Sequence, residues 1–391
     1  MSHQEYRLSV RKRFHSRKRA AAPIMERMER IRRLAAAGFL AAIVIAPASW
    51  LTLYIPARLA TDELRADPVV YATAAQHVRE GASMYNPLPS PGPHRFGPHY
   101  LYPPLFAVAL SWLPEPSALT VQRVLYVLGI AGVFAMGLGL AILARWPRVR
   151  GTLAVVAFTV LLPPLVHALD AANVAPAVWG LAALGVALSS PLGASLLVLG
   201  AAAKIVPAWP LIVLLVRRPR GTMPATVATI AACALAVGLT LGPGRTLAEL
   251  TTWLAYVVPA LGQGQFVTPP YALRDGSLSA FWSVVIHGNF SPVFAPIRLF
   301  GDPWPRELPT AARIYLAMMG IALPAVAAFV TRRRSVPDQA AIVLAMATLA
   351  SPILRITSVP FIFPAAVVFL RRRRCRADDE RLTDQPAGAR E

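Results

Sequence analysis

Residues 118–144 read ALTVQRVLYVLGIAGVFAMGLGLAILA, with Arg123 as the one charged side chain among these 27 residues. An α-helix rises about 1.5 Å per residue, so about 20 apolar residues cross the roughly 30 Å hydrocarbon core of a bilayer. Residues 36–54 and 223–241 form similar runs, and hydrophobic residues make up 56% of the 391-residue chain. The sequence therefore predicts an all-α polytopic membrane protein.

Basic residues gather in five groups, each beside an apolar run. The groups lie at residues 7–33, 145–150, 217–220, 332–334 and 371–376. Such groups mark the cytoplasmic ends of membrane spans, and they also attract anionic lipid head groups. We therefore assign the formal net charge of +20 to topology and to membrane lipids, and not to a nucleic-acid partner.

With the basic groups in the cytoplasm, the chain divides into three parts. We expect a basic cytoplasmic arm over residues 1–35, one integral membrane domain over residues 36–370, and a charged cytoplasmic tail over residues 371–391. The apolar runs predict about nine to eleven transmembrane or re-entrant helices, and large external loops at residues 57–101 and 243–309. The sequence therefore predicts a multi-pass protein of the cell membrane with both termini in the cytoplasm.

Two segments do not fit simple crossings of the membrane. Residues 102–113 are about 12 residues, which rise only about 18 Å, so they predict a short re-entrant or interfacial helix. Residues 192–216 must begin and end on the same side. Proline removes a helical donor and a lysine in apolar surroundings is costly, so we predict two half-helices that meet near Lys204 and Pro207.

Four polar groups from separate segments fall on the external side in this topology. They are Asp67 with Tyr71, Asp170 with Asn173, Asp275 with Ser277, and Arg355. Ionisable residues close to a bilayer are costly and commonly mark functional sites. We therefore expect these segments to converge on one external site.

Short motifs along the chain carry a resemblance to a known family. In order they are Asp67-x-x-x-Tyr71, Gly81-x-x-x-Tyr85, Tyr102-Pro-Pro-Leu105, Asn173 before an apolar run, Lys204-Ile-Val-Pro207, Asp275-Gly-Ser277-Leu278 and Ser351-Pro352. Across about residues 36–370 their order and spacing resemble glycosyltransferase family 87, whose members are actinobacterial membrane enzymes of the GT-C type. The resemblance implies a GT-C-type helical bundle and sugar transfer from a polyprenyl phosphate to a glycolipid or lipoglycan acceptor. It implies mannose as the sugar, as in the family's α-1,2-mannosyltransferases, with arabinofuranose as the close alternative.

Three departures from the family pattern bear on the sugar or the acceptor more than on the reaction class. Ala172 stands where the family often has glutamine, and Asp275 stands where it often has asparagine. The segment after Ser351-Pro352 lacks the usual tryptophan and histidine pair.

Asp67 is the candidate general base. In an inverting transfer the acceptor hydroxyl loses its proton as it attacks the anomeric carbon, and a carboxylate within about 3 Å accepts that proton. Asp67 follows the first span closely, and the resemblance implies the family's catalytic aspartate at this position. The alternative role is a helix N-cap, because an Asp-Pro pair suits the start of a helix, and the two roles are compatible.

Arg355 and Lys204 are the candidate ligands of the donor phosphate, whose developing charge a cation stabilises. Arg355 lies in the last predicted hairpin, where a guanidinium suits a phosphate; extension to the lipid head groups is its alternative. Lys204 serves the same phosphate if the predicted helix break opens to the outside, and otherwise serves helix packing or an ion pair.

Seven further residues are candidates for binding the sugar or the acceptor. They are Tyr71, Tyr85, Tyr102, Asp170, Asn173, Asp275 and Ser277. Tyrosine rings stack on sugars but also anchor proteins at membrane interfaces. Asp170 and Asn173 offer hydrogen bonds to hydroxyl groups, although they also suit the ends of two neighbouring helices.

The expected partners are a polyprenyl-phosphate sugar donor, a glycolipid or lipoglycan acceptor, and membrane lipids. We expect no cofactor, and the two cysteines lie too far apart in sequence to indicate a metal cluster; a divalent-metal requirement stays open. A lipid-linked sugar transporter or flippase is the alternative from another class, since a helix broken at Lys204 is typical of transporter sites. A structural partner in an envelope-assembly complex is the third candidate.

Overall fold

The computed structural model describes residues 27–31, 33–34, 37–38, 41, 44–86, 100–257, 292–294, 310–351 and 356–383. All regular secondary structure within these ranges is helical. Asp275, Ser277 and Arg355 lie outside the described residues.

Three helices are long and apolar enough to cross a membrane. They are α5 (Ala118–Ala144), α11 (Pro219–Leu241) and α16 (Thr310–Val330). Five shorter apolar helices accompany them: Val44–Ala60, α8 (Ala175–Leu188), α9 (Pro191–Ala203), α10 (Ala208–Arg217) and α17 (Val336–Ala350). The predicted all-α polytopic membrane protein is therefore confirmed.

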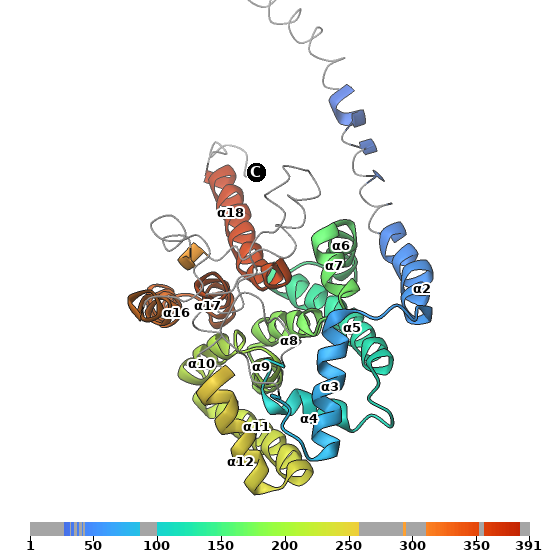
Figure 1. Ribbon diagram of the computed structural model, residues 1–391. Helices are drawn as coiled ribbons and strands as arrows, with labels where there is room; N and C mark the ends of the chain where they lie inside the picture. Colours follow the sequence, from blue (N-terminus) through green and yellow to red (C-terminus); the bar gives the residue numbers. More distant parts are fainter. Residues whose placement is uncertain are drawn as a thin grey trace, which may run out of the picture.

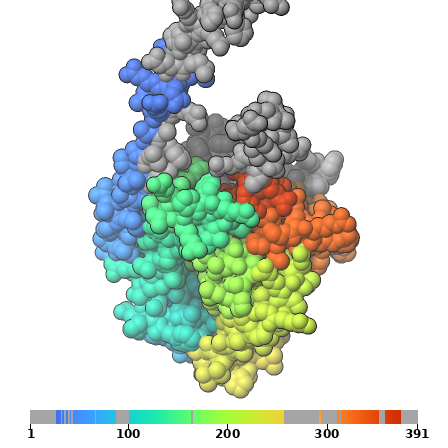
Figure 2. Space-filling view, turned by 180° about the vertical axis from the view of Figure 1, so that it is seen from behind, coloured from blue at the N-terminus to red at the C-terminus, as the bar shows by residue number. Residues whose placement is uncertain are grey.

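Shorter or more polar elements complete the described structure. They are η1 (Trp50–Tyr54), α2 (Ile55–Ala60), α3 (Ala66–Glu80), α4 (Pro104–Ser111), α6 (Arg148–Leu161), α7 (Pro163–Asp170), α12 (Pro243–Thr252), η2 (Trp253–Val257), η4 (Pro292–Phe294), η5 (Ile356–Ile362) and α18 (Phe363–Thr383). Figure 1 shows α2 and α16 at opposite edges of the molecule, with α3 and α4 packed beside α5 and α11. The space-filling view from behind (Figure 2) shows the N-terminal residues, in blue, along one edge of a continuous body.

Glycines bring α5 and α8 into backbone contact. A Cβ atom on Gly132 would lie 2.1 Å from the carbonyl oxygen of Pro176, and one on Gly180 would lie 2.4 Å from that of Gly132. A Cβ atom on Gly139 would lie 2.6 Å from the carbonyl carbon of Ala183. Small residues permit this close approach of helices in membrane proteins. Because α8 begins just after Asn173, this packing fixes where Asn173 lies relative to α5.

The predicted break near Lys204 is confirmed, because α9 ends at Ala203 and α10 begins at Ala208. Lys204 itself has an extended backbone, with φ −148° and ψ 130°. Arg218, just after α10, donates to the carbonyl oxygen of Ser189, just before α9, at 2.9 Å. The start of α9 and the last residue of α10 therefore lie at the same end of the bundle. At 13 and 10 residues they rise only about 20 and 15 Å.

Four of the five basic groups meet at one end of the bundle, which we call the basic end. Arg371 donates to the carbonyl oxygen of Leu143, two residues before the Arg145 group, at 2.7 Å. Arg371 also binds the carboxylate of the buried Asp338, at 2.7 and 2.9 Å. Arg217 donates to the backbone oxygen of Arg332, which joins two more groups. This gathering is the arrangement that the positive-inside pattern predicts.

Candidate functional site

Asp67 and Asn173 meet beside the N-terminal part of α5, away from the basic end, since Gln122 contacts Arg65 and Tyr126 contacts Asp170. The Nδ2 atom of Asn173 donates to Oδ2 of Asp67 at 2.7 Å. Asp67 lies in the first turn of α3, where the helix dipole favours a negative charge. The N-cap of α3 is Arg65, so the alternative of Asp67 as the N-cap is wrong. The carboxylate binds a separate segment instead.

Asn173 has two partners, and one of them gives it the expected role at a helix end. Its Oδ1 atom accepts from the backbone nitrogen of Ala175 at 2.7 Å, which stabilises the start of α8, and its Nδ2 atom binds Asp67. The preceding residue, Ala172, is buried and has φ +47°, a conformation that alanine rarely adopts. The turn that presents Asn173 is therefore held in a strained shape by its surroundings.

Tyr71 lies one turn after Asp67 on α3, inside the protein. Its hydroxyl donates to the hydroxyl of Tyr102 at 2.9 Å, and the two rings meet edge to face with centroids 5.3 Å apart. Phe106 makes a similar edge-to-face contact with Tyr71 at 5.2 Å. Burial, and then the neighbouring Tyr102 and Asp67, raise the pKa of Tyr71 well above its usual range. Tyr71 is therefore a neutral donor that packs α3 against α4.

Tyr85 also lies in the core, where its side chain is 1% exposed. Its hydroxyl donates to the backbone oxygen of Tyr102 at 2.8 Å, and its ring lies 5.6 Å from that of Tyr100. These tyrosines therefore form one aromatic cluster behind Asp67. In this arrangement the ring of Tyr85 packs against protein and presents no open face to a sugar.

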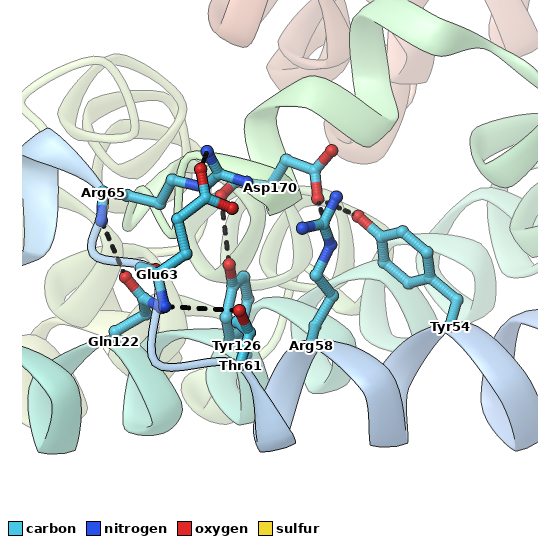
Figure 3. Close-up of polar contacts among 8 residues, drawn as sticks. All are labelled: Tyr54, Arg58, Thr61, Glu63, Arg65, Gln122, Tyr126 and Asp170. Carbon is cyan, nitrogen blue, oxygen red and sulfur yellow. Dashed lines mark hydrogen bonds and ion pairs between the residues drawn. The ribbon is translucent and has the colours of Figure 1, made fainter.

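Asp170 forms a second polar group, shown in Figure 3. Its Oδ1 atom binds the Nε atom of Arg58 at 2.8 Å and accepts a hydrogen bond from the hydroxyl of Tyr54. The hydroxyl of Tyr126 donates to the backbone oxygen of Asp170 at 3.1 Å. The candidate sugar ligand Asp170 is thus engaged in an ion pair between α7 and α2.

Sequence reasoning missed Tyr54, Arg58 and Tyr126. A signal for the first two exists, since Tyr54 and Arg58 are four residues apart and so share one helix face at the end of the first apolar run. Their partner is 116 positions from Tyr54, and no local pattern identifies it.

Lys204 lies toward the same end of the bundle as Asn173. Gly193 of α9 packs against Gly185 of α8, while Gly200 of α9 packs near Leu181, so the two helices are antiparallel. The C-terminal end of α9, where Lys204 caps the helix, therefore lies near the N-terminal end of α8. The break between the half-helices faces the end of the bundle that carries Asp67.

Among the residues that the structure describes, no group of three or more histidine, cysteine, aspartate or glutamate residues is arranged to hold a metal ion. The described acidic residues of the site, Asp67 and Asp170, bind Asn173 and Arg58 respectively.

Comparison with known proteins identifies the family. Searches of curated proteins and of solved structures give no match. The model of glycosyltransferase family 87 matches residues 100–352, which is more than half of the chain. The matched region contains Asn173 and the break at Lys204, and Asp67 lies ahead of it. The chain belongs to glycosyltransferase family 87 and is a membrane glycosyltransferase.

Proposed function

We propose that this enzyme transfers mannose from a polyprenyl phosphate to a glycolipid or lipoglycan acceptor on the external face of the cell membrane, the reaction that the resemblance to family 87 implies. The observation that carries the proposal is the pair of Asp67 and Asn173. It lies beside the N-terminal part of α5, where Gln122 and Tyr126 contact Arg65 and Asp170, about 30 Å from the basic end at Leu143. Because basic residues favour the cytoplasm, the pair faces outward, where lipid-linked sugars serve as donors.

Asp67 acts as the general base. Asn173 holds one carboxylate oxygen, Oδ2, and the second oxygen accepts the proton of the acceptor hydroxyl. The hydroxyl oxygen forms a bond to the anomeric carbon as the bond from that carbon to the phosphate oxygen breaks. The lipid phosphate leaves with the electron pair of that bond, and the configuration at the anomeric carbon inverts.

Arg355 and Lys204 bind the leaving phosphate in this proposal. A guanidinium pairs with a phosphate through two parallel hydrogen bonds, and an ammonium acts as a point charge. The orientation of α9 supports Lys204, since its break faces the end that carries Asp67. Asp275 and Ser277 bind hydroxyl groups of the sugar or acceptor.

A sugar-lipid transporter is the second candidate function. The two half-helices α9 and α10 favour it, because broken helices form binding sites in transporters. Transport alone, however, gives no role to a carboxylate held by an asparagine. Transfer of arabinofuranose in place of mannose is the close alternative within the glycosyltransferase class.

One experiment separates these functions. Membranes that contain the protein receive radiolabelled polyprenyl-phosphate mannose, or the arabinose equivalent, with a crude glycolipid acceptor. Labelled glycolipid formed with mannose supports the proposal, and product formed only with arabinose corrects the sugar. Movement of label across the membrane without a new glycosidic bond indicates a transporter. Neither transfer nor movement of label from either compound contradicts the proposed polyprenyl-phosphate donor.

A further inference from the structure

Gln122 is a fully buried polar side chain on α5 whose amide makes two hydrogen bonds to one segment of backbone. Its Oε1 atom accepts from the backbone nitrogen of Arg65 at 2.9 Å, and its Nε2 atom donates to the backbone oxygen of Glu63 at 2.9 Å. This segment is the link between α2 and α3, and it has no regular secondary structure. It ends two residues before Asp67. The amide of Gln122 therefore fixes the point from which α3 and its carboxylate depart.

Tyr126 binds the backbone of the turn that carries Asn173. It lies four residues after Gln122, on the same face of α5. Its hydroxyl donates to the backbone oxygen of Asp170, three residues before Asn173. Figure 3 shows Gln122 next to Arg65 and Glu63 of the link, and Tyr126 below Asp170.

The turn before Asn173 is closed by backbone hydrogen bonds from residues 171–173 to α7, whereas the link between α2 and α3 has no regular secondary structure. The turn also contains the left-handed Ala172. Such conformations persist where the surroundings over-determine them. One helix face thus binds both segments, and the hydrogen bond between Asp67 and Asn173 forms where the two segments then meet.

We propose that Gln122 and Tyr126 are positioning residues that set the spacing between Asp67 and Asn173 from one face of α5. The proposal rests on the proposed function, in which Asp67 is the base. Gln122 and Tyr126 act through Arg65 and Asp170 respectively, and their effect falls on the orientation of the carboxylate rather than on binding of donor or acceptor.

The first test compares Gln122→Leu with Gln339→Leu. Gln339 is a matched control, since it is also buried and its amide also joins two segments, but at the basic end. We expect Gln122→Leu to lower kcat about tenfold to a hundredfold, the scale of a small misplacement of a reacting group, with each KM within about twofold. Gln339→Leu should lower thermal stability and leave kcat per folded molecule unchanged. Equal losses of kcat in both variants would reduce Gln122 to a structural role.

A double-mutant cycle gives the sharper result. If Tyr126 acts through the pairing of Asn173 with Asp67, Tyr126→Phe should lower kcat about tenfold in the parent and much less in an Asn173→Ala background. Removing one hydroxyl leaves the ring in place, so this variant is expected to fold. Fully multiplicative losses would overturn the proposal.

Hydrogen exchange tests the same inference without any substrate. In Gln122→Leu the peptides that cover residues 61–67 and 170–175 should exchange faster than in the parent, and in Gln339→Leu they should not. Unchanged exchange in Gln122→Leu would overturn the positioning role, whatever the enzyme transfers. Faster exchange in an enzyme without sugar transfer would retain the spacing role and reject the proposed function.

Discussion

Asn173 and Asp67 are 106 positions apart in the sequence, and their side chains are joined by a hydrogen bond of 2.7 Å. The amide donates to one carboxylate oxygen and also caps the start of α8 through Ala175. A carboxylate has two oxygens, so it can be held by one and accept a proton on the second. The pair therefore supports a base of fixed orientation.

The Asp67→Asn variant should lower sugar transfer about a hundredfold or more, because it removes the general base. Its amide oxygen can still accept from Asn173, so the fold should be kept. Turnover of the purified enzyme and its melting temperature measure the two effects.

The reciprocal exchange, Asp67→Asn with Asn173→Asp, is the control. It restores one amide and one carboxylate to the pair but moves the negative charge to α8. Thermal stability should be near that of the parent and activity should stay low. Near-parental turnover in either variant would remove Asp67 from the mechanism.

The ion pair of Arg58 and Asp170 should tie the first apolar helix to the turn before Asn173. Both side chains are partly buried, at 27% and 25% exposed, and their atoms lie 2.8 Å apart. Asp170→Asn should lower stability by about 1 to 3 kcal/mol, since it weakens a charged hydrogen bond. The exchange Arg58→Asp with Asp170→Arg should recover part of that loss in a melting experiment. No recovery would mean that the pair does not hold these segments together.

The contact between α5 and α8 should be sensitive to one added methyl group. Gly132→Ala would place a Cβ atom 2.1 Å from the carbonyl oxygen of Pro176, so the helices must separate. We expect a loss of about 1 to 3 kcal/mol and lower activity, because α8 carries the turn of Asn173. Gly238→Ala in α11 is the matched control, since nothing lies within 4 Å of its added Cβ. Equal melting temperatures for the two variants would contradict this packing.

Single cysteines test the topology in a background without Cys233 and Cys375. A cysteine at Asn86, near the end of the bundle that carries Asp67, should react with a thiol reagent that cannot cross the cell membrane. The reagent is added to cells whose outer envelope layers have been made permeable. A cysteine at Arg333, at the basic end, should react only after the membrane is made permeable. Both positions are exposed in the structure. The reverse pattern would place the Asp67 site in the cytoplasm.

Arg355→Lys separates phosphate binding from anchoring in the lipid head groups. Lysine keeps the charge but not the two-pronged fork, so the loss in use of the polyprenyl-phosphate donor should be about 1.5 to 3 kcal/mol. Protein level and melting temperature should stay near normal. Donor saturation curves at fixed acceptor measure the effect. If Arg355→Lys equals the parent and Arg355→Ala is poorly expressed, the arginine is an anchor.

Features of the fold that depend on residues close together in the sequence could be predicted from the sequence. Apolar length predicts the spans such as α5 and α11, and Pro207 with Lys204 predicts the break between α9 and α10. Asp67 and Asn173 could each be selected, because an acidic residue after a span and an asparagine before an apolar helix are local signals.

The tertiary structure alone decided which of these residues meet. Tyr85 lies in the core, Asp170 pairs with Arg58, and Gln122 gives no local signal of its role. Hydropathy and helix propensity act over a few residues, whereas the contacts of Gln122 and Asp170 join segments 57 and 112 positions apart. The physical reason is packing: glycines let α5 and α8 approach until their backbones touch, and that approach brings the turn of Asn173 to the start of α3.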